Sequence, residues 1–155
     1  MLEIIHFKKQ FTSGEIIEAL NEVFPALDFK EIKIEDYPEK EDQRPNTVYL
    51  VIQQNKSEFP MTLELYNTAQ ENTAQREQFI AWKLSKILGC RILVGYQEKE
   101  FADSPFHNLI FDGDKIFLAT DLESKLSGDG DQNVKIADER EVKIAMFNSK
   151  GQLID

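Results

Sequence analysis

The side chains that could carry catalysis are few. The chain has one cysteine, Cys90, and two histidines, His6 and His107. Residues 103–107, with the sequence DSPFH, bring an acid, a hydroxyl and an imidazole into one predicted loop, a combination that hydrolases use. No Gly-x-Ser-x-Gly nucleophile elbow accompanies it, and Asp, Ser and Pro are also ordinary loop residues. We predict no catalytic residues, and keep as an alternative a small hydrolase-like enzyme that uses His107 with a neighbouring acid.

Residues 129–133, with the sequence DGDQN, place oxygen ligands at alternating positions, as the start of a calcium loop does. The sixth position, where such a loop turns sharply on Gly, is Val134, and the twelfth, where a Glu closes the site, is Arg140. Gly and Asp also dominate turns for conformational reasons. The segment therefore predicts a solvated turn and no metal site.

The remaining candidate groups favour structural interpretations. Cys90 follows a predicted helix end and opens an apolar strand, which is typical of a small buried hydrophobe. A lone cysteine excludes an internal disulfide and a cysteine-rich zinc site. His6 fits a satisfied histidine on the first strand. The chain contains no Gly-x-Gly-x-x-Gly run and no phosphate-cradling Gly-x-x-x-x-Gly-Lys run, so we predict no cofactor.

Acidic charge is the strongest compositional signal. The chain has 28 Asp and Glu against 18 Lys and Arg, which gives a formal net charge of -10. This charge repels phosphate backbones and argues against direct nucleic-acid binding. Two predicted loops concentrate it and are our partner-binding candidates for a basic protein. They contain Glu39, Glu41 and Asp42 in the first loop and Glu98, Glu100 and Asp103 in the second. The alternative is that both are merely solvated loops.

Periodicity predicts two helices, at about residues 13–24 and 73–88. Alternating or continuous apolar runs predict strands, the clearest being a two-sided apolar run at 48–52 and a hairpin on the Asp-Gly at 112–113. Further strands are expected at 2–6, 32–34, 61–66, 91–96 and 141–147. The order of elements predicts a single α+β domain over residues 1–155, with a largely antiparallel sheet covered by two amphipathic helices.

The 155 residues suit one domain, and their 41% hydrophobic content can build a sizeable core. No stretch reaches the 18 or so uncharged apolar residues that a membrane span needs, and the first residues carry a charge at Glu3. We therefore expect no membrane association and a cytoplasmic location.

From Met61 to Glu123 the sequence runs through an alternating strand, a polar helix ending in LSKILG, the apolar run CRILV, a Pro-containing loop and then LIFDGD. In this order of features the chain resembles small acidic proteins of bacterial toxin-immunity systems, whose members neutralise one cognate toxin by binding it. The resemblance implies a class of activity. Such families share no catalytic residues, so it assigns no site residue.

Acidity and this resemblance together predict a non-enzymatic protein-binding module, an immunity-type inhibitor that occludes a basic cognate toxin domain. Two alternatives remain open at this point. One is the enzyme that uses His107, and the other is an adaptor or accessory domain with some other protein partner. The oligomeric state does not follow from the sequence.

Overall fold

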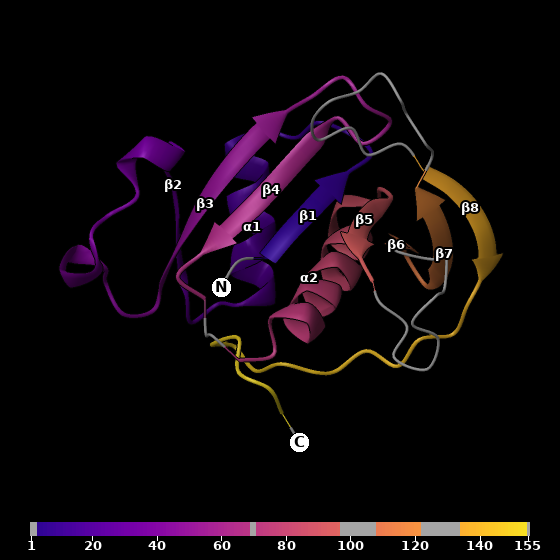
Figure 1. The fold of residues 1–155 in the computed structure, drawn as a ribbon. Coiled ribbons are helices and arrows are strands. Elements are labelled where there is room, and N and C mark those ends of the chain that lie inside the picture. The colour runs from indigo at the N-terminus through magenta and orange to yellow at the C-terminus, as the bar shows by residue number, and fades with distance from the viewer. Residues whose placement is uncertain (1–2, 69–70, 97–107, 122–133, 155) are drawn as a thin grey trace.

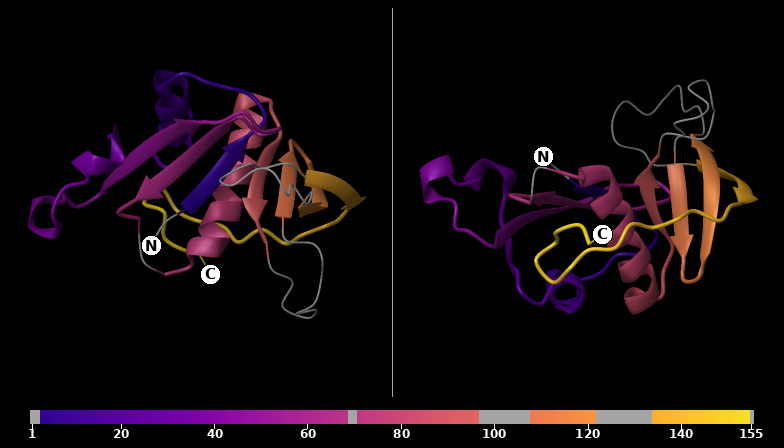
Figure 2. Two further views of the ribbon diagram at one scale, coloured as in Figure 1. Left: turned by 45° about the horizontal axis from the view of Figure 1, so that its top comes forward. Right: turned by 90° about the horizontal axis from the view of Figure 1, so that it is seen from below.

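The computed structural model describes residues 3–68, 71–96, 108–121 and 134–154. They form an eight-stranded sheet in the order β2-β3-β4-β1-β5-β6-β7-β8, with two helices on one of its faces (Figures 1 and 2). The β2–β3 pair is parallel and the other pairings of these strands are antiparallel. The predicted α+β class is confirmed. The strands are β1 (Glu3–Phe7), β2 (Asp28–Glu31), β3 (Thr47–Gln54), β4 (Met61–Tyr66), β5 (Ile92–Gly95), β6 (Asn108–Asp112), β7 (Lys115–Asp121) and β8 (Val134–Glu139).

Helix α1 (Ser13–Val23) begins at the predicted position because its first turn is capped in both directions. The Thr12 side chain accepts the Glu15 amide and the Glu15 carboxylate accepts the Thr12 amide, which satisfies two amides that a helix start leaves unpaired. The helix buries Ile16 and Leu20 against the sheet and ends just before Pro25, which cannot continue it.

Helix α2 (Thr73–Leu88) has the predicted bounds and ends at Gly89, whose φ of 62° is the left-handed conformation that favours glycine. Phe79, Ile80 and Leu84 are buried as expected, whereas Ile87 is 38% exposed and lies off the apolar side. Within the described residues, no helix is both long and apolar enough to cross a membrane.

The hairpin between β6 and β7 is confirmed. Its loop is Gly113 and Asp114, and Gly113 has a φ of 62° that suits the first residue of a tight two-residue hairpin turn. Both faces of β5 are buried, as its sequence predicts. Ile92 and Val94 join the main core on the helix side, while Leu93 packs with Phe59 in a smaller core on the other face.

Two predicted strands are wrong. Residues 32–34 are not a strand, because β2 ends at Glu31 and Ile34 begins a 3-10 turn. The predicted strand at 141–147 is irregular, apart from an isolated bridge between Phe147 and Leu153. Val142 and Ile144 still bury surface against the main core, so their alternation reflects contact with that core and not pairing in the sheet.

Strand β1 places a charged residue in the core. Glu3, Ile5 and Phe7 face the helices and are fully buried, whereas Ile4 is 37% exposed. The buried Glu3 carboxylate accepts Arg76 Nη1 at 3.0 Å and the Thr68 hydroxyl at 2.8 Å. Burial raises the pKa of Glu3, and the guanidinium of Arg76 opposes that rise.

Arg76 is 2% exposed and joins three parts of the chain. Besides Glu3, it donates through Nε to the carbonyl of Gly151 at 3.2 Å and through Nη2 to the carbonyl of Glu71 at 2.6 Å. Each bond to the charged guanidinium is stronger than a neutral one. This network ties β1, the start of α2 and the turn near the C-terminus together.

We expect the substitution Arg76→Met to lower the free energy of unfolding by about 3–5 kcal/mol, because it leaves the Glu3 carboxylate buried without its counter-ion. The double variant with Glu3→Leu should recover much of that loss. Lys86→Met is the matched control, because its ion pair with Asp114 is exposed, at 40% and 92%, and should contribute less than about 1 kcal/mol. Urea unfolding measures all three, and equal losses for the two single variants would contradict this account.

A second carboxylate, that of Glu77, accepts a backbone amide of β1 that has no partner strand. Strand β5 pairs with β1 only at His6 and Phe7, so the Ile4 amide beyond them has no strand neighbour on that side. It donates instead to Glu77 Oε2 of α2 at 2.9 Å. Glu77 is half-buried, and mainly because of this burial its pKa is raised to about 7.

The pKa of Glu77 is about 7 in the folded chain and 4.5 in the unfolded chain. Between these pH values the folded state therefore binds a proton at Glu77 that the unfolded state has released. Stability should therefore fall as the pH rises through this window, by on the order of 2 kcal/mol after allowance for the half-exposed carboxylate. Urea unfolding at about pH 5 and about pH 7.5 should show that Glu77→Gln removes this drop. Glu18→Gln, an exposed change on α1, should leave it unchanged.

Candidate functional site: the acidic arm and the tyrosine cluster

The connection between β2 and β3, residues 33–45, carries a concentration of acidic residues, and we term it the acidic arm. It contains two 3-10 turns, η1 (Ile34–Asp36) and η2 (Lys40–Asp42), and extends beyond the sheet at the left of Figure 1. Residues 35–42 hold five acids and one base. All five carboxylates belong to exposed residues, namely Glu35, Asp36, Glu39, Glu41 and Asp42.

Hydrogen bonds restrain the arm within itself and at its base. Each 3-10 turn is closed by backbone bonds, and the Gln43 side chain donates to the carbonyl of Pro38 at 3.1 Å. At the base of the arm, Asn67 Nδ2 of the β4 end donates to the carbonyls of Arg44 at 3.2 Å and Thr47 at 2.7 Å. A restrained loop loses less conformational entropy when it binds a partner.

A cluster of three tyrosines, Tyr37, Tyr49 and Tyr66, anchors the arm to the sheet. Tyr49 and Tyr66 are directly paired across β3 and β4. The ring of Tyr37, from the arm, lies with its centroid 5.8 Å from that of Tyr49 and 5.1 Å from that of Tyr66. Such ring contacts stabilise beyond the area they bury. Tyr49 is only 5% exposed, while Tyr37 and Tyr66 remain partly accessible.

The charge of Glu64 extends the acidic surface onto the face of the sheet away from the helices. The Tyr66 hydroxyl donates to Glu64 Oε2 at 2.6 Å. Burial and this carboxylate raise the pKa of Tyr66 to about 12, so the phenol stays protonated at neutral pH. A carboxylate beside aromatic rings suits a Lys or Arg side chain, which can bond to the first and stack on the second.

On the same face, His6 Nδ1 lies 2.9 Å from the hydroxyl of Thr62 on β4. Burial lowers the pKa of His6 to about 4, so its ring is neutral at pH 7. The prediction of a satisfied strand histidine is confirmed. Among the described residues, no group of three or more His, Cys, Asp or Glu side chains is arranged to hold a metal ion.

The structure places one of the two predicted partner-binding loops. Glu39, Glu41 and Asp42 lie together in the arm. The other candidates lie outside the described residues, namely Glu98, Glu100 and Asp103, together with His107 and the 129–133 turn. Cys90 is 6% exposed, which confirms its predicted burial, and mainly because of that burial the pKa of its thiol is raised.

Sequence reasoning missed the residues that anchor the arm. Tyr37 lies in the first of the two predicted acidic loops, Tyr49 in the predicted two-sided apolar strand at 48–52, and Tyr66 at the end of the predicted strand at 61–66. The antiparallel register sets Tyr49 opposite Tyr66, and directly opposed strand residues share a face. The sequence pattern alone does not fix this register.

Comparisons of the chain with protein-family models, with curated proteins and with solved structures gave no match. The site must therefore be interpreted from its own geometry and charge.

We expect Tyr37→Ala to loosen the arm, because it removes both ring contacts that join the arm to β3 and β4. Trypsin should then cleave after the exposed Lys40 about fivefold faster or more, since cleavage follows local opening. Tyr37→Phe is the control, because it keeps the ring and should cleave at the wild-type rate. Mass spectrometry of the peptide that ends at Lys40 measures the rate, and equal cleavage of all three proteins would show that the ring contacts do not hold the arm.

Proposed function

We propose that the chain is a non-enzymatic, protein-binding inhibitor of the immunity type, which occludes a basic domain of a cognate toxin. The observation that carries the proposal is the acidic arm, with its exposed carboxylates held on the tyrosine cluster. An immunity-type inhibitor must present a surface that is complementary in charge to its toxin and preorganised in shape.

The arm supplies the charge. Its five carboxylates are the kind of surface that steers a positively charged partner and speeds association. Rim charges of this kind mainly raise the association rate, so the effect should weaken as salt is added.

The tyrosine cluster supplies contact area beside the charge. Tyrosine is enriched among the residues that dominate binding energy, because it buries a large rigid surface and keeps a polar group at its end. The rings of Tyr37 and Tyr66 are partly accessible, and Glu64 lies beside Tyr66 on the same face of the sheet. A basic side chain of the partner would bind to these three residues.

The test requires the cognate toxin, which we expect to be a secreted protein with a basic C-terminal domain, encoded by the adjacent reading frame. Co-expression with this chain should relieve the toxicity of that domain, and the purified pair should associate faster at low ionic strength. The triple reversal Glu39→Lys, Glu41→Lys and Asp42→Lys should weaken binding by on the order of 100-fold through like-charge repulsion, with the melting curve little changed.

A matched control reverses three acids at the opposite edge of the sheet. Asp138→Lys, Glu139→Lys and Glu141→Lys change the net charge equally, and these residues are also exposed. Binding should survive this change. Equal losses of binding in the two triple variants would show that the arm acts only through the net charge of the protein. If His107→Ala abolishes protection from the toxin and the arm variant keeps it, the enzyme alternative is favoured. A neighbouring frame without a basic toxin domain would favour the adaptor alternative.

A further inference from the structure

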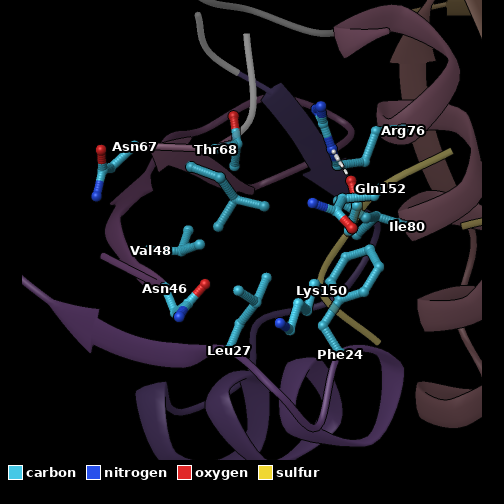
Figure 3. Close-up of a pocket in the computed structure, with 12 residues that line it drawn as sticks. Phe24, Leu27, Asn46, Val48, Asn67, Thr68, Arg76, Ile80, Lys150 and Gln152 are labelled. Carbon is cyan, nitrogen blue, oxygen red and sulfur yellow. Dashed lines mark hydrogen bonds between the residues drawn. The ribbon is translucent and has the colours of Figure 1, made fainter. Parts of the chain in front are cut away.

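A cavity of about 220 Å³ lies on the helix side of the sheet, where five parts of the chain converge. The end of α1, the start of β3, the end of β4, the first half of α2 and the turn at residues 148–152 all contribute side chains (Figure 3). This site is separate from the tyrosine cluster, which faces the other side of the sheet, and its function does not depend on the proposed inhibitor activity.

The floor of the cavity is apolar and its rim is polar. Leu27, Val48 and Leu65 are among the apolar lining residues. The rim carries side-chain amides and one ammonium group, from Asn46, Gln152 and Lys150. An apolar pocket with a few convergent polar groups is the common form of a small-ligand site.

The charge of the lining is unusual for this chain. Although 28 of the 155 residues are acidic, no Asp or Glu is among the described residues that line the cavity. Of its two cationic residues, Arg76 is neutralised by the buried Glu3 carboxylate. Lys150 makes no ion pair with any described residue, so the described lining of the cavity carries one positive charge that no described carboxylate neutralises.

The turn at residues 148–152 fixes the position of the cationic rim. The Asn148 Oδ1 accepts the amides of Lys150 at 2.9 Å and Gln152 at 3.0 Å. Gly151 has a φ of 75°, a backbone conformation that favours glycine, and packs beside Arg76 and Leu27. The side chains of Lys150 and Gln152 therefore project from a turn whose backbone is fixed by hydrogen bonds to Asn148.

We propose that this cavity binds a small organic monocarboxylate with a compact apolar body. The apolar body would lie on Leu27, Val48 and Leu65, and the carboxylate would accept hydrogen bonds from Lys150 and Gln152. Cavities of about 150 Å³ hold a benzene molecule, so this larger cavity has room for a phenyl ring with a short acidic side chain. A charge-assisted bond to the ammonium would distinguish the acid from a neutral analogue.

Phenylacetate is a suitable probe, with 2-phenylethanol as the neutral analogue and acetate as the anion without an apolar body. In an NMR titration of the full chain, phenylacetate should shift the amides of residues 148–152 in a saturable way, and it should bind about tenfold more tightly than either analogue. The substitution Lys150→Met keeps the apolar stem and removes the charge. It should weaken phenylacetate about tenfold and leave 2-phenylethanol unchanged.

Lys143→Met is the matched control, because Lys143 is an exposed lysine of the same C-terminal segment that does not line the cavity. It should bind phenylacetate like the wild type. The proposal is overturned if phenylacetate gives no saturable shift up to about 10 mM, if Lys150→Met binds it unchanged, or if acetate or 2-phenylethanol binds equally well. None of these outcomes bears on the arm, so the two proposals fail independently.

Discussion

The buried ion pair between Glu3 and Arg76 is the constraint on which much of the fold depends. A carboxylate and a guanidinium that are both withdrawn from water are tolerable only while they meet each other and their remaining hydrogen-bond partners. Those partners come from the β4 end, the start of α2 and the C-terminal turn. The first strand, the second helix and the last turn must therefore arrive together, although they are distant in sequence.

Both proposed sites lie around the end of the sheet that this network organises. The base of the arm and the rim of the cavity share Asn67, whose amide nitrogen holds the carbonyls of Arg44 and Thr47. The cavity uses the helix side of β3 and β4, while the tyrosine cluster uses their other side, since successive residues of a strand point to opposite faces. One pair of strands thus supports two chemically different surfaces.

Charge is distributed unevenly between these surfaces. The arm concentrates carboxylates in water, where they cost little and act at a distance on a partner. The described lining of the cavity contains no carboxylate and includes an ammonium that no described acid neutralises. In a chain of net charge -10, the two ligands that we propose are opposite in charge, a basic protein for the arm and a small carboxylate for the cavity.

The sequence by itself determined the elements whose signals are local. The capping box at Thr12 and Glu15, the left-handed Gly89 and the Asp-Gly hairpin each act within a few residues, so both helices and the α+β class could be predicted. The exposure of the arm acids could be predicted from their crowding in one loop, which also contains Pro38 and Pro45. Only the tertiary structure decided which charges are buried, because Glu3 and Arg76 look like any other acid and base until the fold brings them within 3.0 Å. The same holds for the tyrosine cluster and the cavity, since both are made by residues whose contact depends on strand register and on packing between distant segments.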